Sequence, residues 1–400
     1  MPGLRLLTSP DSYIKLARHE RTARYMKKLS SLCLIVISSP LQSPPPHLLT
    51  TMTDKETLTP QQSRTVGALL GLHAGDSLGA TLEFQPHARI AERYPHGLRD
   101  IIGGGPFSWP AGHATDDTDM TRAVLLAYRD AALKRSSPSK PTPVSVSDLA
   151  RRSAEYFVDW YEGNWPGRTH GDLPKDIGGA TERGITNFRS NPDAPSGAGQ
   201  GSAGNGSLMR CLPTALFQPD LSRLVAESRA ISAVTHDDTN CVIACAAYNA
   251  CAAALVAGAS PSYAVRAAEA AAIQLEGRGK HGKPEPVTAA IRVGKRFDIA
   301  RAAAQGPPLD LLPGGASGYV LETLIIAIAA VLDQRSLEDI LVDVVRIGKD
   351  TDTNGAVAGG LLGARDGESA IPRRWKHQLQ FGLEFRDTAL EILEVLKNRT

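Results

Sequence analysis

The strongest constraint on the fold of this 400-residue chain is the spacing of its apolar residues, which is helical wherever a clear pattern exists. Between Val320 and Leu332 the apolar side chains recur at helical intervals and line one face. Related spacing is found from Gln61 onward and in Met120 to Leu133, Leu149 to Tyr161, Leu224 to Val234, Asn240 to Val256, Tyr263 to Gln274, Leu337 to Ile347 and Ala389 to Leu396. No stretch has the alternation of a half-buried strand, and no turn of the Asn-Gly type joins two apolar runs. The sequence therefore predicts an all-α protein.

The helical stretches are separated by polar breaks rich in Pro, Gly and Ser, which cover residues 136–147, 191–206, 276–286 and 306–318. None of these breaks contains an apolar run. We expect them to be loops of a single compact multi-helix domain spanning residues 61–400. Hydrophobic residues make up 42% of the chain, which is enough for a large core. Three cysteines in one Ala-rich run (Cys241, Cys245 and Cys251) are expected to be buried core residues in a reducing compartment rather than zinc ligands.

Residues 1–60 differ from the rest of the chain. Residues 1–51 carry seven Lys or Arg against two acidic residues, a net charge of +5, whereas the whole chain has only +2. The apolar run Leu32–Ile37 is too short to span a bilayer. Three interpretations stay open: a signal peptide, a mitochondrial presequence, or a stretch upstream of a true start at Met52. We expect a disordered or dispensable extension on a cytoplasmic, monomeric protein without a membrane segment; a presequence would make the protein mitochondrial.

The low net charge of the whole chain argues against a general nucleic-acid surface.

Two carboxylate clusters, each directly before a helical stretch, are the main candidates for chemistry. The first is Thr115-Asp116-Asp117-Thr118-Asp119, and the second is Lys349-Asp350-Thr351-Asp352-Thr353-Asn354-Gly355. Capping of a helix N-terminus explains one or two oxygens in each cluster. It does not explain three acids within five residues, because their mutual repulsion costs stability. A hard cation needs such a ring of oxygens and removes the repulsion, so the two clusters together indicate a metal site.

The second cluster has the first half of an EF-hand loop but lacks the second half. An EF-hand requires a bidentate Glu at its twelfth position, and that position is occupied here by Leu361. The missing ligands must therefore come from elsewhere in the chain, and the first cluster is the obvious donor.

A Gly-rich segment, residues 199–210, formally contains the pattern G-x-G-x-x-G. No strand precedes it and no G-K-[ST] follows it, so it is neither a Rossmann turn nor a P-loop. Its backbone N–H groups at the start of a helix suit phosphate oxygens, although a plain loop explains the pattern equally well. Glu83 is compatible with an ordinary surface acid. His236 lies at a helix start that Thr235 and Asp238 suffice to cap, so its role is open.

Taken in order along the chain, these motifs resemble the ADP-ribosylglycohydrolase family, which includes dinitrogenase-reductase-activating glycohydrolase and ADP-ribosyl-acceptor hydrolases. The resemblance covers about residues 65–375. The matching segments are Gly67–Gly71, Gly75–Gly79, Glu83-Phe84, Trp109–Gly112 leading to Thr115–Thr118, Asp176–Gly178, Asn205–Arg210, Thr235-His236, Ser317–Val320 and Gly348–Thr353. The pair T-D-D-T and D-x-D-T is specific in this context, whereas the glycine motifs alone are not.

The resemblance implies an all-α domain with a central two-metal cleft that holds two Mg²⁺ ions or, in some members, Mn²⁺. The metal ligands that it implies are Thr115, Asp116 and Asp117 from one side and Asp350, Asp352 and Thr353 from the other. Glu83 matches the family acid beside the metals and the scissile bond, so Glu83 and Asp117 are the catalytic residues we expect. The residues expected to hold the diphosphate and distal part of ADP-ribose are Gly204, Asn205, Gly206, Ser207 and His236.

The implied function is metal-dependent hydrolysis that removes ADP-ribose from an ADP-ribosylated protein or another ADP-ribose conjugate, with free ADP-ribose as product. The bond cleaved would be the ribosyl glycosidic bond. Two alternatives stay open: a non-catalytic relative that binds ADP-ribose or serves structurally, as crystallin-like members do, and a two-metal hydrolase of another nucleotide metabolite. Retention of all six implied metal ligands and of Glu83 favours the enzyme. The motifs do not distinguish arginine, serine, O-acetyl-ADP-ribose or a nucleic-acid end as the acceptor.

Overall fold

The computed structural model describes residues 58–136, 144–277 and 285–397. Across these ranges the chain is helical and has no β-strand, only isolated bridges, which confirms the predicted all-α class. The basic segment 1–51 and most of the predicted loop 276–286 lie outside the described residues. The helices are α2 (Pro60–Gly79), α3 (His87–Arg93), α4 (Asp116–Ser136), α5 (Val146–Tyr161), α6 (Gly179–Ser190), α7 (Leu212–Phe217), α8 (Leu221–Ala233), α9 (Thr239–Val256), α10 (Pro261–Glu276), α11 (Pro286–Gly294), α12 (Ile299–Gln305), α13 (Val320–Leu332), α14 (Leu337–Arg346), α15 (Thr351–Asp366), the short 3₁₀ helix η2 (Glu368–Ala370), α16 (Arg373–Lys376) and α17 (Gly382–Lys397).

Helix positions follow the apolar spacing closely where the apolar runs are long. α13 has the predicted bounds, and α9 begins one residue before its predicted start. The pattern misses α6, because the buried face of this helix combines Thr181 and Gly184 with Ile185 and Phe188 and so contains no apolar run.

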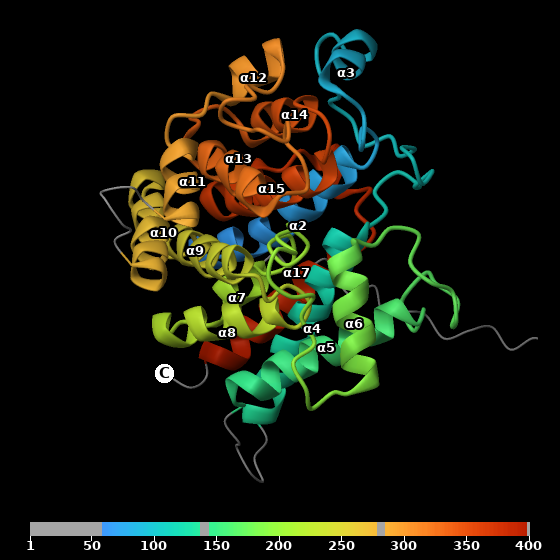
Figure 1. Ribbon diagram of the computed structural model, residues 1–400, viewed down its shortest axis with the longest axis vertical. Coiled ribbons are helices and arrows are strands. Elements are labelled where there is room, and N and C mark those ends of the chain that lie inside the picture. Colours follow the sequence, from blue (N-terminus) through green and yellow to red (C-terminus); the bar gives the residue numbers. More distant parts are fainter. Residues whose placement is uncertain (1–57, 137–143, 278–284, 398–400) are drawn as a thin grey trace, which may run out of the picture. The chain divides into compact units, whose positions relative to one another are not determined.

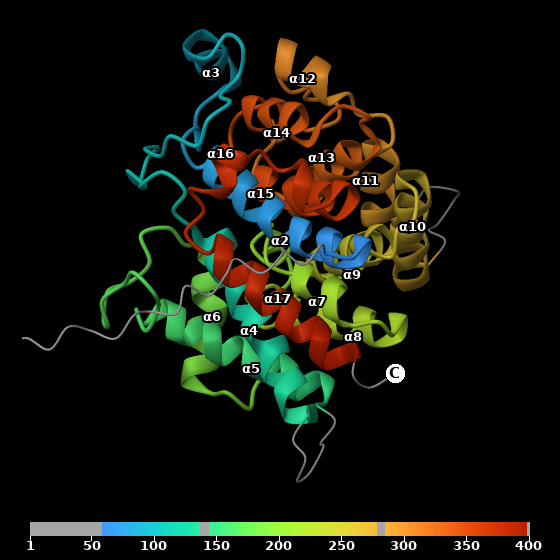
Figure 2. The same cartoon turned by 180° about the vertical axis from the view of Figure 1, so that it is seen from behind.

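Two glycine-rich helices, α2 and α15, form the centre of the domain and make the most extensive contact between any two of the described helices. They lie side by side in both views (Figures 1 and 2). Glycines four residues apart face each other across this contact, Gly71 against Gly359 and Gly75 against Gly355. A Cβ atom at Gly71 would lie 2.3 Å from the Gly359 carbonyl oxygen. The two backbones therefore touch directly, and no side chain fits between them.

The remaining helices cover the central pair from two sides. α10 to α14 gather on the side of α15, whereas α4 to α8 and α17 lie on the other side of α2 (Figures 1 and 2). Between them, α9 packs against α8, α10 and α15. By length and composition α9 could cross a membrane, but 72% of it is buried inside the protein, so core packing accounts for its apolar character. Its cysteines Cys241, Cys245 and Cys251 are buried and free, as expected for core residues.

Replacement of Gly71 tests the backbone contact. In Gly71→Ala the added methyl group would occupy the position of the Gly359 carbonyl, so the helices must separate or distort. We expect the free energy of unfolding to fall by about 3 kcal/mol, measured by chemical denaturation. Gly179→Ala is the matched control, since Gly179 on α6 has no atom within 4 Å of its Cβ position. If both variants were as stable as the wild type, the direct contact would be contradicted.

Candidate active site

The first carboxylate cluster is held against α2 by Asp76, a residue to which the sequence assigns no role. Asp76 is fully buried near the end of α2. Its Oδ1 accepts a hydrogen bond from the Thr115 hydroxyl at 2.9 Å, and its Oδ2 accepts one from the Thr118 N–H at 3.3 Å and another from the Thr118 hydroxyl. These bonds fix the start of α4, and with it Asp116 and Asp117, against α2.

The second cluster is joined to the segment after α2 by a pair of backbone hydrogen bonds. The Phe84 N–H donates to the Lys349 carbonyl at 2.7 Å, and the Lys349 N–H donates to the Gln85 carbonyl at 2.8 Å. Phe84 (φ 61°) and Lys349 (φ 65°) both adopt the left-handed conformation, which is uncommon for residues with a Cβ atom. This pairing, which we call the backbone clamp, brings Glu83 next to the cluster that begins at Asp350.

The two clusters open into a cleft of about 510 Å³. The predicted site residues that line the cleft are Glu83, Asp116, Gly204, Asn205, Gly206, His236, Asp350, Asp352 and Thr353. Asp117 is buried beside the lining: its Oδ2 lies 3.4 Å from the Thr353 hydroxyl and 3.2 Å from the Thr115 hydroxyl. The structure therefore brings the two clusters, which are more than 200 residues apart in the sequence, into direct contact.

The carboxyl groups around the cleft strongly perturb one another. Burial, followed by the negative charge of Asp176, raises the pKa of Glu83 to about 9. Burial and the neighbouring carboxylates also raise the pKa values of Asp116, Asp117 and Asp352 well above the usual range. These groups cannot all be ionised together without a positive partner.

Three buried carboxylate oxygens at this site have no hydrogen-bond partner: Glu83 Oε2, Asp117 Oδ1 and Asp352 Oδ1. Oxygens of Glu83, Asp176 and Asp352 also lie within 4.8 Å of one another, close enough to share one cation. Carboxylate and hydroxyl oxygens are the donors that hard divalent cations such as Mg²⁺ and Mn²⁺ prefer. The residues present therefore fit a divalent cation.

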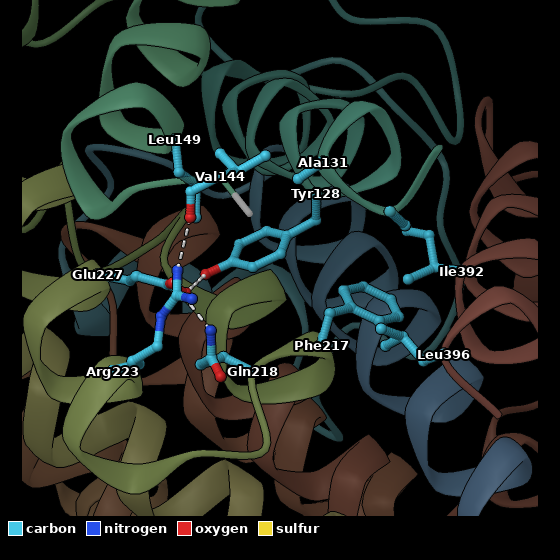
Figure 3. Close-up of a pocket in the computed structure, with 11 residues that line it drawn as sticks. Tyr128, Ala131, Val144, Leu149, Phe217, Gln218, Arg223, Glu227, Ile392 and Leu396 are labelled. Atoms are coloured by element: carbon cyan, nitrogen blue, oxygen red, sulfur yellow. Dashed lines mark hydrogen bonds and ion pairs between the residues drawn. The ribbon is translucent and has the colours of Figure 1, made fainter. Parts of the chain in front are cut away.

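A buried carboxylate outside the cleft provides a contrast. Glu227 on α8 is 1% exposed and accepts hydrogen bonds from the Tyr128 hydroxyl at 2.7 Å, from Gln218 at 2.8 Å and from Arg223 at 2.7 Å (Figure 3). Its partners come from α4, α8 and the end of α7, so this network serves packing between helices. Among the described residues, the buried carboxylate oxygens without a hydrogen-bond partner are the three at the cleft.

Two acids differ from the expectation drawn from the sequence. Asp119 belongs to the first cluster by position, but its oxygens accept hydrogen bonds from the indoles of Trp165 at 2.8 Å and Trp160 at 2.9 Å, so it serves the core. Asp176 has no predicted role, yet it lines the cleft, where burial followed by the charge of Asp76 raises its pKa to about 7. Asp176 lies in one of the matching motifs, which is the only signal in the sequence that could have identified it.

The Gly-rich loop is organised by a buried arginine. Arg210 donates to the Gly206 carbonyl at 2.6 Å and to the Thr235 hydroxyl at 2.7 Å, and its guanidinium lies 4.5 Å from the centre of the Phe157 ring. Burial, followed by the positive charge of Arg210, lowers the pKa of His236 to about 3, so the imidazole is neutral. A Cβ atom at Gly206 would lie 2.9 Å from His236 Cε1, which is why a glycine is needed at this position.

Asn205 and Ser207 are engaged in contacts within the protein. The Asn205 amide donates to Asp350 Oδ2 at 2.6 Å and to the Thr323 hydroxyl at 2.9 Å, so it connects the Gly-rich loop to the second cluster. The Ser207 hydroxyl accepts a hydrogen bond from Ser232 at 2.8 Å and does not line the cleft. Of the residues predicted to hold ADP-ribose, Ser207 is therefore the one that the structure does not bring to the cleft surface.

Known proteins are similar to this chain in sequence and fold. The profile of the ADP-ribosylglycohydrolase family matches residues 57–400. ADP-ribosylarginine hydrolase Tri1 of Pseudomonas putida (strain GB-1) is 30% identical over 345 residues, which cover 84% of this chain and 80% of that protein. The ADP-ribosyl-(dinitrogen reductase) glycohydrolase of Rhodospirillum rubrum is 29% identical over 327 residues, which cover 80% of this chain and 92% of that protein. A solved structure described as an ADP-ribosylglycohydrolase-related protein complex superposes with a TM-score of 0.61 at 26% identity, covering 84% of this chain and 99% of that chain.

The match to the family profile covers all the described residues, and it includes every predicted site residue. The helical fold and the solved relative agree with it. The family that the motifs indicate is thereby confirmed: this chain belongs to the ADP-ribosylglycohydrolase family and is a hydrolytic enzyme.

Proposed function

We propose that this enzyme removes ADP-ribose from ADP-ribosylated arginine side chains in a hydrolysis that depends on divalent metal ions. The arginine acceptor is supported by the relatives from Pseudomonas putida and Serratia proteamaculans, both ADP-ribosylarginine hydrolases, at 30% and 28% identity. The metal dependence rests on one observation, the three buried carboxylate oxygens that have no partner beside the cleft.

Two Mg²⁺ or Mn²⁺ ions would be held by Thr115, Asp116, Asp117, Asp350, Asp352 and Thr353. When bound, such ions supply the positive charge that orients ribose hydroxyls and stabilises charge in the transition state. Asp117 lies between Thr115 and Thr353, and its free Oδ1 is available to a cation. It would therefore join the two ligand sets, in keeping with its predicted part in catalysis.

Glu83 is the proposed proton carrier. Its carboxyl lies in the cleft with those of Asp176 and Asp352, and its burial, followed by the negative charge of Asp176, raises its pKa and so favours its protonated form. Protonated Glu83 would donate its proton to the departing guanidine nitrogen as the bond from that nitrogen to the ribose C1′ breaks. The Glu83 carboxylate would then accept a proton from the water whose oxygen bonds to C1′. The products are the arginine side chain and free ADP-ribose, and Glu83 returns to its starting state.

The Gly-rich loop is the proposed diphosphate site. Because Arg210 donates to the Thr235 oxygen, the Thr235 hydroxyl hydrogen is free to be donated to Nδ1 of His236, 2.7 Å away. The neutral imidazole then carries its hydrogen on Nε2, which faces Gly204 and Gly206. This arrangement provides a donor for phosphate oxygens next to the backbone of the loop.

The first test is the release of free ADP-ribose from arginine-linked and serine-linked substrates. We expect release from the arginine linkage with Mg²⁺ or Mn²⁺ and none in EDTA. Release only from the serine linkage would contradict the proposed acceptor. Undiminished release in EDTA would contradict the metal dependence.

Replacement of Glu83 tests its role in proton transfer. Glu83→Gln keeps the shape of the side chain but cannot exchange a proton, so we expect kcat to fall about 10²- to 10⁴-fold while the affinity for free ADP-ribose changes little. Glu92→Gln, on the exposed face of α3, is the control and should leave kcat unchanged. Equal losses of turnover and ADP-ribose affinity would argue that Glu83 binds the substrate instead.

Replacement of Asp352 tests the cation independently of activity. In EDTA, Asp352→Asn should melt at a higher temperature than the wild type, because burial and the neighbouring carboxyl groups disfavour the ionised form of Asp352 in the folded protein. Mg²⁺ at 100 times its Kd should stabilise the wild type by about 2.7 kcal/mol and the variant much less. The exposed Asp310→Asn serves as control and should behave like the wild type in both conditions. An unchanged response of Asp352→Asn to Mg²⁺ would show that Asp352 is not a ligand.

A further inference from the structure

Phe84 is an exposed aromatic residue that the packing of the fold does not explain. Its residue surface is 64% exposed, and it lines the cleft directly beside Glu83. Its φ of 61° is a costly conformation for a bulky side chain, and it persists because the backbone clamp to Lys349 holds it. A strained backbone that presents a large apolar ring to solvent gains nothing for stability, so the position of the ring points to a ligand.

The Phe84 ring belongs to an aromatic cluster that already binds a cation. Its centre lies 6.3 Å from that of Phe107 in an edge-on arrangement, and Phe107 lies 5.9 Å from Trp109. Lys175 places its ammonium group 5.5 Å from the centre of the Trp109 ring, while His113 stacks on the same indole. In this cluster the Trp109 ring thus has Lys175 as its cation, whereas the exposed ring of Phe84 is free to take one from a ligand.

The Phe84 ring and the Gly-rich loop line the same cleft but pack against different side chains. The Gly-rich loop contacts the second cluster through the hydrogen bond from the Asn205 amide to Asp350, and the loop packs against His236. Phe84 also reaches the second cluster, through its backbone bond to Lys349, but its ring packs against Phe107 and not against the Gly-rich loop. A substrate whose diphosphate lies on the loop and whose scissile bond lies at Glu83 therefore has Phe84 available to its leaving group.

We propose that Phe84 determines acceptor specificity by receiving the guanidinium of the arginine acceptor on the face of its ring. This inference rests on the proposed function. A guanidinium is planar, permanently charged and weakly hydrated, so it stacks well on aromatic rings. A serine acceptor has neither a positive charge nor a planar group, so Phe84 should not contribute to its binding.

The test compares Phe84→Leu, which keeps apolar bulk without a ring, with Phe84→Tyr, which keeps the ring. On an arginine-linked substrate we expect Phe84→Leu to lower kcat/KM about 3- to 30-fold, mainly through KM, and Phe84→Tyr to remain close to the wild type. Inhibition by free ADP-ribose should be the same for all three proteins, because the ring does not contact that part. Tyr263→Leu, which removes an exposed aromatic ring from α10, is the control and should have no effect on kcat/KM.

A second probe separates this inference from the proposed function. Agmatine carries a guanidinium without ADP-ribose, and by calorimetry it should bind the wild type more tightly than Phe84→Leu. Unchanged kcat/KM in Phe84→Leu, a loss in Phe84→Tyr equal to that in Phe84→Leu, or weaker inhibition by ADP-ribose in Phe84→Leu would each overturn the role of Phe84. If the wild type released no ADP-ribose from the arginine linkage, the proposed function would be overturned. If agmatine also bound the wild type and Phe84→Leu equally well, the contact between Phe84 and the guanidinium would be overturned too.

Discussion

The contact between the backbones of α2 and α15 is the constraint on which the site depends. The glycine face of α2 continues to Gly79, whose carbonyl accepts a hydrogen bond from the Thr351 hydroxyl of α15 at 2.7 Å. Asp76 lies in the last turn of α2 and Asp352 in the first turn of α15. The close approach of the two backbones therefore sets the separation of the acids, and any spreading of the helices would widen the site as well as weaken the core.

This close approach brings several carboxyl groups together, and the fold compensates their mutual repulsion only in part. The acids of both clusters are buried except Asp350, which is half-buried. The first turns of α4 and α15, with Asp116 and Asp352, direct the positive ends of two helix dipoles at the cleft. Asp350, at the N-cap of α15, makes no capping bond and is instead held by Asn205. Helix ends contribute partial charges only, so the remaining repulsion and the unpartnered oxygens favour a full positive charge in the cleft.

Much of this arrangement follows from the sequence, and the exceptions have physical reasons. Long apolar runs predict the main helices, and the density of acids in two short motifs predicts that they meet. Asp76 and Asp176 lie in matching motifs but are single acids without a cluster around them, so their part in the site is seen only in the folded chain. Asp119 and Ser207 belong to the candidate segments but hydrogen-bond to indole and hydroxyl partners in the core. For Asp119 the reason is that adjacent positions of α4 face different directions.

The backbone clamp between Phe84 and Lys349 lets one short segment provide both the proposed proton carrier and the proposed acceptor contact. In the left-handed conformation the chain turns sharply after Glu83, so one side chain is buried among the acids and the next is exposed at the cleft. The two residues can then change independently. Glu83 is restricted by the carboxylates around it, whereas Phe84 packs against a single ring, so acceptor preference can vary within this fold while the acidic centre is kept.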